Sequence, residues 1–238
     1  MAREVVFIAD DLGVREEVNE AILHAHRCGA LTGACLMMGQ PATRTAVAMA
    51  REHPSLEVGW HLHLADSRPC SRSEWPWGRS LWSAGFGIGL SPGMRDLVRR
   101  EIEGQWQAYR ETGLPCRFVS AHHHLHLHPF VRRKLMETLP SDFDGWVRWG
   151  QPRFFGSSPW KAFYRLLDAL LQAPHRRRSP FRLSTTLWGI DRTLRMNADE
   201  ILCVLPTLGQ GLHEFMFHPR RVEQDADTLA LLKLRNQR

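Results

Sequence analysis

The sequence contains no apolar run near the roughly 18 residues that a membrane-spanning helix needs. Its first apolar stretch, from Val5 to Ala9, is short and runs directly into two acidic residues, so we do not expect a secretory signal. The five cysteines are an odd number without a CxxC pair, which predicts reduced thiols in a cytoplasmic protein. Gly85, Gly87 and Gly89 lack the Gly-Lys-Ser/Thr ending of a phosphate loop, which argues against nucleotide binding.

The composition is that of an ordinary globular domain. Of the 238 residues, 43% are hydrophobic and 24% are charged, which excludes wholesale disorder. The length suits one α/β domain, so we expect residues 1–238 to form a single unit. Basic residues outnumber acidic ones by 31 to 25, giving a net charge of +6, and nearly all of them are arginines. This charge favours anionic partners without specifying a fold.

Short β-rich runs alternate with helical patterns along the whole chain, in about seven βα units. The predicted strands cover residues 5–9, 34–38, 56–64, 118–119, 146–149, 183–188 and 212–218. Residues 65–93 are rich in Ser, Pro, Gly and Trp and predict a long loop inserted after the third strand. The pattern indicates one parallel α/β sheet, either a closed or distorted barrel or a doubly wound sheet.

Polar side chains follow the predicted strands at the points where those strands end. They are Asp10 and Asp11 after the first strand, His61 and His63 in the third, His122 to His128 after the fourth, Arg148 in the fifth, and Glu214 and His218 in the last. Because the carboxyl ends of parallel strands meet at one rim, we expect these residues to lie together. Carboxylate and imidazole groups suit a divalent transition metal that keeps positions open for water.

Each of these elements also has a purely structural interpretation. The Asp pair is typical of a helix N-cap, and for His63 the structural interpretation, a hydrogen-bonded core residue, is favoured over a ligand. The histidine run could belong to a solvated loop, and Glu214 could neutralise an arginine. Arg148 lies between two tryptophans and could be a stacked structural cation.

Four motifs in this order resemble the YdjC-like carbohydrate deacetylases. They are Ala-Asp-Asp-Leu-Gly at 9–13, Gly-Trp-His-Leu at 59–62, Ala-His-His-His-Leu-His at 121–126 and Glu-Phe-Met-Phe-His-Pro at 214–219. The stretch from Asn19 to Met37 looks most like the branch associated with hopanoid biosynthesis. Three departures occur: Leu12 replaces a common Phe, Ser120-Ala121 replaces the Asp-Ser of the chitobiose enzymes, and Arg220 replaces a small residue.

The resemblance implies a single-domain distorted (β/α) barrel of about seven parallel strands with one divalent metal ion. Zn²⁺ is favoured, with Mg²⁺, Ni²⁺, Co²⁺ or Mn²⁺ as alternatives. It implies metal ligation by Asp11, His61 and His122. Asp10 would be the general base, Arg148 would orient it, and His218 would be the general acid. We assign substrate contacts to His124, His126 and Glu214.

The implied reaction removes the N-acetyl group from an acetylated amino sugar, for the hopanoid branch an N-acetylglucosaminyl hopanoid. The alternatives are a deacetylase of soluble chitooligosaccharides and a metal-dependent phosphoesterase or amidohydrolase on a similar barrel. An amidohydrolase usually carries His-x-His where this chain has Asp10-Asp11. A non-catalytic, arginine-rich membrane- or nucleic-acid-binding protein is the remaining alternative, although the basic residues are scattered along the chain and we expect no nucleic-acid partner.

Two segments combine aromatic and basic residues, as an interfacial docking surface requires. The first holds Trp75, Trp77, Trp82 and Phe86 with Arg72 and Arg79, and the second runs from Trp160 and Phe163 to the basic cluster at 175–178. We predict that both bind a lipid or a bilayer, which would place a cytoplasmic protein at the inner face of the membrane. The alternative is a loop core for the tryptophans and a solvated face for the arginines.

Overall fold

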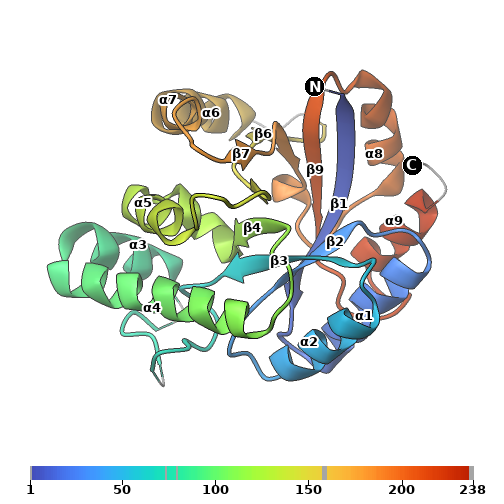
Figure 1. The fold of residues 1–238 in the computed structure, drawn as a ribbon. Helices are drawn as coiled ribbons and strands as arrows, with labels where there is room; N and C mark the ends of the chain where they lie inside the picture. Colours follow the sequence, from blue (N-terminus) through green and yellow to red (C-terminus); the bar gives the residue numbers. More distant parts are fainter. Residues whose placement is uncertain (1, 73, 79, 157–159, 236–238) are drawn as a thin grey trace.

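A computed structural model describes residues 2–235 except 73, 79 and 157–159. Within these residues the chain forms one nine-stranded sheet in which all pairs are parallel, in the order β6-β8-β9-β1-β2-β3-β4-β5-β7 (Figure 1). The strands are β1 (Arg3–Leu12), β2 (Gly33–Leu36), β3 (Glu57–Leu62), β4 (Phe118–Ala121), β5 (Trp146–Val147), β6 (Gln151–Arg153), β7 (Arg182–Leu183), β8 (Thr186–Trp188) and β9 (Gly211–Phe217).

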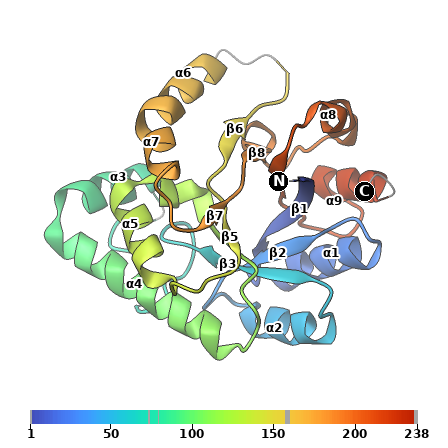
Figure 2. The ribbon, with the colours of Figure 1, turned by 45° about the horizontal axis from the view of Figure 1, so that its top comes forward.

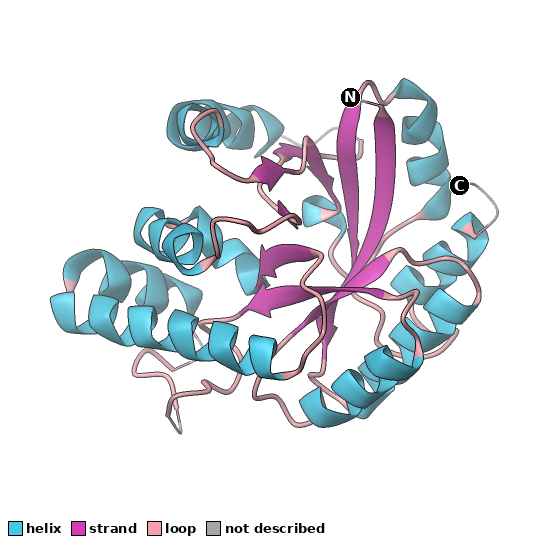
Figure 3. Ribbon diagram, in the orientation of Figure 1, coloured by secondary structure: helices cyan, strands magenta, loops and turns pink. Residues whose placement is uncertain are grey.

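Helices follow most of the strands and cover the outside of the sheet, as Figures 2 and 3 show. The α-helices are α1 (Glu16–Arg27), α2 (Thr43–Glu52), α3 (Leu81–Leu90), α4 (Pro92–Glu111), α5 (Pro129–Thr138), α6 (Trp160–Leu167), α7 (Ala173–Arg176), α8 (Ala198–Val204) and α9 (Ala226–Leu234). Shorter turns are η1 (His122–Leu127), the π-helical η2 (Asp168–Gln172), η3 (Ile190–Arg192) and η4 (Leu205–Thr207).

The sheet curls into a half-barrel whose two faces carry different side chains. Alternate residues of each strand point to opposite faces. Outward residues such as Phe7 and Trp60 join the large core beneath the helices. Inward residues form a smaller cluster: Val6, Ile8, Cys35, Phe118, Trp146 and Leu212. This arrangement confirms the predicted α/β fold with a parallel, distorted barrel.

The number of strands differs from the prediction of about seven. The predicted strand 183–188 is two strands, β7 and β8, which lie far apart in the sheet order, and β6 had no clear pattern in the sequence. β6, β7 and β8 are only two or three residues long, which is too short for an alternating pattern to emerge.

The predicted loop at 65–93 is only partly a loop. Its second half forms α3, whose N-cap Ser80 accepts a hydrogen bond from the backbone N–H of Ser83, and Pro92 opens the next helix directly afterwards. Helix propensity does not predict this helix, because Leu81–Leu90 contains three glycines and glycine disfavours helical backbone.

The first half of this segment packs inward. Trp75 and Trp77 are buried and stacked with their ring centroids 5.3 Å apart, and their indole N–H groups donate to the carbonyl oxygens of Ser67 and Leu64. The prediction that these two tryptophans dock to a membrane is therefore wrong, because neither ring is available at the surface. Arg79 and the side chains of Trp82, Trp160 and Phe163 lie outside the described residues.

Candidate active site

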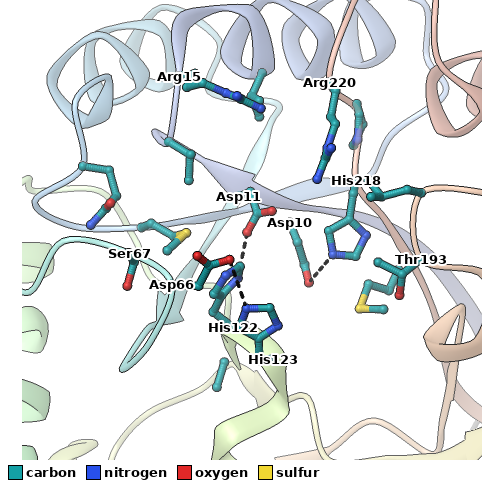
Figure 4. A pocket seen from close by; sticks show the side chains of 18 of the residues that line it. Asp10, Asp11, Arg15, Asp66, Ser67, His122, His123, Thr193, His218 and Arg220 are labelled. Carbon is teal, nitrogen blue, oxygen red and sulfur yellow. Dashed lines mark ion pairs between the residues drawn. The ribbon is translucent and has the colours of Figure 1, made fainter. Parts of the chain in front are cut away.

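The side chains predicted for the site converge at the carboxyl ends of the strands, around a cavity of about 820 Å³ shown in Figure 4. The cavity lining includes Asp10, Asp11, His122, His124 and His218. His61 on β3 and Arg148 after β5 are fully buried against them. Asp10 on β1 has the same parity as Val6 and Ile8 of the inward cluster, so the alternation that fills the barrel interior also directs its side chain to this rim.

Asp11, His61 and His122 form a compact cluster. Asp11 Oδ1 lies 3.0 Å from His122 Nδ1 and 3.6 Å from His61 Nε2. One ligand atom from each of the three residues lies within 4.8 Å of the other two. Asp11 and His122 are 111 positions apart along the chain, with His61 between them, and β1, β3 and η1 bring the three together.

A β-bulge allows both aspartates of β1 to face the cavity. Successive side chains of a regular strand point to opposite faces. Here the pairing of β1 with β2 shifts register between Ala9 and Leu12, and Asp11 has the left-handed φ of 67°. Aspartate tolerates this conformation better than most residues. The bulge turns Asp11 to the side that Asp10 already occupies, as Figure 4 shows.

A buried hydrogen-bond chain fixes the orientation of His61. Ser120 Oγ donates its proton to Cys35 Sγ at 2.9 Å, and it lies 2.6 Å from His61 Nδ1. Because Ser120 has only one hydroxyl proton, it must accept from His61, which places the imidazole proton on Nδ1. The lone pair on Nε2 then faces Asp11. Burial lowers the pKa of His61 despite the nearby Asp10 carboxylate, so the ring is neutral, as metal ligation requires.

The donor atoms of this cluster fit a divalent cation. Asp11 Oδ1 and His61 Nε2 are buried and have no hydrogen-bond partner among the described residues. Burial alone would raise the pKa of Asp11, but the His122 imidazole beside it holds that pKa well below its usual value. An ionised carboxylate and two imidazoles are the ligand types of Zn²⁺ and its neighbours.

Asp10 is held by a buried arginine. Arg148 Nη1 donates to Asp10 Oδ2 at 2.5 Å, and Arg148 Nε donates to Glu214 Oε1 at 2.7 Å. Burial would raise the pKa of Asp10, but the Arg148 guanidinium holds that pKa well below its usual value. Asp10 is therefore ionised at neutral pH. Its second oxygen, Oδ1, has no hydrogen-bond partner among the described residues and remains free to accept a proton.

His218 lies on the other side of the acidic pair from His122 (Figure 4). Its Nε2 is 3.9 Å from Asp10 Oδ2, and its Nδ1 has no partner among the described residues. Its backbone N–H donates to Asp227 Oδ2 at 2.6 Å, so a buried carboxylate on α9 anchors the loop that carries the ring. The sequence could not predict this role of Asp227, because the group it binds is the backbone N–H of His218, nine residues away.

Two of the three residues that the sequence analysis assigned to substrate contact do not line the described cavity. His126 and Glu214 are buried and do not belong to the described lining of the cavity, whereas His124 does. The position of Glu214 beneath Arg148 suits a structural counter-charge, and burial raises its pKa despite that cation. His63 is structural: its ring nitrogens lie 2.9 Å from Ser67 Oγ and from the carbonyl oxygen of Met38.

The rim of the cavity also contains Asp66 and Arg15, for which the sequence analysis found no functional signal. Asp66 and His123 both have left-handed backbone, and Asp66 Oδ2 lies 3.7 Å from His123 Nε2. Arg15 and Arg220 line the opposite side. Asp66 and Arg15 lie outside helices and strands, where no periodic pattern indicates a functional side chain.

The fold and these converging side chains define a class: an α/β half-barrel with carboxylate and imidazole groups gathered at the carboxyl ends of its strands. The sequence profile of the YdjC-like proteins matches residues 4–237, and the chain belongs to this family.

Similar proteins include carbohydrate deacetylases from three bacteria. The enzyme of Vibrio vulnificus is 33% identical over 128 residues, covering 53% of this chain and 51% of its own. That of Brevibacillus brevis is 33% identical over 130 residues (54% and 52%), and that of Geobacillus stearothermophilus is 34% identical over 131 residues (55% and 54%). The chain thus spans about half the length of the curated relatives it matches.

A solved structure shares the whole fold. The crystal structure of a candidate cellobiose-phosphate cleavage protein from Enterococcus faecalis superposes with a TM-score of 0.69, covering 98% of this chain and 90% of its own. The identity is 18%, so this likeness concerns the fold alone.

Proposed function

We propose that the protein is a metal-dependent hydrolase that removes the N-acetyl group from an acetylated amino sugar. The observation that carries this proposal is the convergence of Asp11, His61 and His122, with Asp10 and His218 beside them. The family match over 4–237 and the carbohydrate deacetylases among the relatives support it, and support treating residues 1–238 as one domain.

The chain's own residues divide the chemistry between them. A divalent cation held by Asp11, His61 and His122 would supply a Lewis acid that polarises the acetyl carbonyl and acidifies a water molecule. Asp10, ionised beside Arg148, accepts the proton of the attacking water. His218 donates a proton to the departing nitrogen as the C–N bond breaks, which gives the free amine and acetate. His124 lines the cavity and contacts the sugar.

For the substrate, we propose an N-acetylglucosaminyl hopanoid, with the protein in contact with the inner face of the membrane. The resemblance of residues 19–37 to the hopanoid-associated branch supports this choice over soluble chitooligosaccharides, as does Ser120-Ala121 in place of Asp-Ser. None of the helices in the described residues is long and apolar enough to cross a bilayer.

Acetate release from N-acetylglucosaminyl hopanoid and from N-acetylchitooligosaccharides, measured with the metal content of the purified protein, tests the proposal. We expect bound metal, activity that chelators abolish, and loss of both metal and activity in His61→Ala and His122→Ala. The exposed His175→Ala is the matched control and should behave as wild type. Full activity in the chelated protein, or phosphate release in place of acetate release, would contradict the proposal.

A further inference from the structure

The exposed hydrophobic side chains of the molecule gather on one side. Among the side chains that the structure describes, eight large hydrophobic ones are exposed, and six of them lie on α3, η1, α6 and η2. They are Phe86 (67% exposed), Leu90 (82%), Leu127 (38%), Leu166 (58%), Leu170 (64%) and Leu171 (56%). We call these six residues the apolar face. Scattered single residues are normal on a surface, but six on neighbouring elements indicate a binding surface.

Contacts join the elements that carry the apolar face. Gln172, at the end of η2, donates from Nε2 to the carbonyl oxygen of Leu127 at 3.3 Å. A Cβ placed on Gly89 of α3 would lie 3.9 Å from His128 Nε2, so the C-terminal end of α3 lies against the start of α5. Figures 1 and 2 both show α3, α5 and α6 on the same side of the molecule, away from α1, α2, α8 and α9.

Basic residues adjoin the apolar face. Between residues 160 and 178 the chain carries Lys161, Arg165, Arg176, Arg177 and Arg178 but only one acidic residue, Asp168. Arg176 pairs with Asp168 at 2.5 Å. Arg165, Arg177 and Arg178 are exposed and make no ion pair with the described residues. Leucines next to unpaired arginines on one helical segment form the pattern of a helix that lies in a membrane interface.

We propose that the apolar face and the unpaired arginines of α6–α7 dock on the surface of an anionic lipid bilayer. The leucines and Phe86 enter the headgroup boundary, and the guanidinium groups meet lipid phosphates. The positive charge selects this occupant over a second copy of the chain, because a two-fold dimer through this face would bring identical basic segments together.

The docking surface lies next to the cavity in the fold. η1 contributes His122, His123 and His124 to the cavity lining, and Leu127 of the same segment belongs to the apolar face. A protein docked in this way would hold its cavity beside the headgroups. This inference rests on the proposed function and extends it, because docking would give the cavity access to a sugar that is linked to a lipid.

Co-sedimentation with phosphatidylcholine vesicles, with and without phosphatidylglycerol, tests the docking surface. We expect the wild type to pellet with the anionic vesicles and Leu170→Glu/Leu171→Glu to bind them about tenfold more weakly, because carboxylates replace two leucines that would enter the bilayer on docking. Arg177→Glu/Arg178→Glu should lose the preference for phosphatidylglycerol. Leu229→Glu, at an exposed leucine of α9 outside the apolar face, is the matched control and should bind as wild type.

Acetate release from a soluble N-acetylated sugar separates docking from catalysis. All these variants should keep the wild-type rate, because none of the changed residues lines the cavity. Equal pelleting of wild type and the Leu170→Glu/Leu171→Glu variant would overturn the docking surface even if the enzyme deacetylates sugars. Self-association in analytical ultracentrifugation that this variant abolishes, without vesicle binding by the wild type, would overturn it in favour of a second copy. Vesicle binding by a protein without deacetylase activity would support the docking surface and contradict the proposed function.

Discussion

At the scale of single residues, the two adjacent carboxylates have different surroundings. Asp10 contacts the Arg148 guanidinium at 2.5 Å, whereas Asp11 contacts two imidazoles. Both are ionised, but the possible ligand groups beside them differ: Asp11 lies with His61 and His122, whereas Asp10 lies with His61 and Cys35, and burial raises the pKa of the Cys35 thiol. The pair therefore separates into one residue suited to hold a cation and one suited to accept a proton.

Replacing Asp10 by asparagine tests this division. We expect Asp10→Asn to bind metal as the wild type does but to lose about 10²- to 10⁴-fold in turnover, which is the usual contribution of a general base. The measurements are metal content and acetate release under saturating substrate. Asp199→Asn, at an exposed carboxylate of α8, controls for the loss of a charge. A near-normal rate in Asp10→Asn would refute the base assignment.

The sequence allowed much of this site to be predicted at the residue scale. Strand ends identify Asp10, Asp11, His61, His122 and Arg148, because the carboxyl ends of parallel strands share one rim. The bulge that turns Asp11 inward could not be predicted, since it depends on the register with β2. The roles of Ser120, Cys35 and Asp227 likewise depend on contacts across the fold, which no local pattern encodes.

At the scale of elements, the long and regular segments were predictable and the short ones were not. α4 shows a clear helical stripe over 20 residues, whereas β6 and β7 are defined only by pairing with distant strands. α8 is capped by Asn197, whose side chain accepts from the backbone N–H groups of Asp199 and Glu200. Local sequence therefore determines the helices of this protein better than its edge strands.

A substitution at Gly59 tests how tightly β3 and β4 pack in the barrel interior. A Cβ at Gly59 would lie 2.3 Å from Cδ2 of Phe118, whose ring is stacked on Trp146 at 4.6 Å. We expect Gly59→Ala to lower the free energy of unfolding by about 1–3 kcal/mol through overpacking, measured by urea denaturation.

The matched control is Gly104→Ala in α4, where a Cβ has no neighbour within 4 Å. We expect this substitution to raise the free energy of unfolding by up to about 1 kcal/mol, because alanine favours helical backbone. Equal effects of the two substitutions would show that the close approach of Gly59 to Phe118 does not limit stability.

At the scale of the whole molecule, buried imidazoles make stability depend on pH. Burial lowers the pKa of His126 well below its usual value, and burial lowers that of His63 to about 3. In the unfolded chain both groups take up a proton near pH 6.5. The unfolded state therefore binds more protons than the folded state below this pH, and stability falls as the pH decreases.

His126→Phe isolates one of these groups. We expect the wild type to lose about 1.4 kcal/mol per pH unit for this group below about pH 6.5, and the variant to show a correspondingly shallower loss. Urea unfolding at several values between neutral and mildly acidic pH measures the slope. His175→Phe, at an exposed position, controls for the substitution. A slope unchanged in His126→Phe would mean that this ring is protonated in the folded protein.

The open ends of the sheet also affect how copies of this molecule meet in concentrated solution. Because β6 and β7 stand at the two edges of the described sheet, their outer backbone groups could recruit a strand from another molecule. β6 has three residues with Pro152 at its centre, and β7 has two residues including Arg182. Pro152 has no amide hydrogen to donate and Arg182 carries a charge, and both edge strands are very short. These edges therefore offer little backbone with which a strand of another molecule could pair. A designer who lengthened either edge with β-branched residues would remove this safeguard against aggregation.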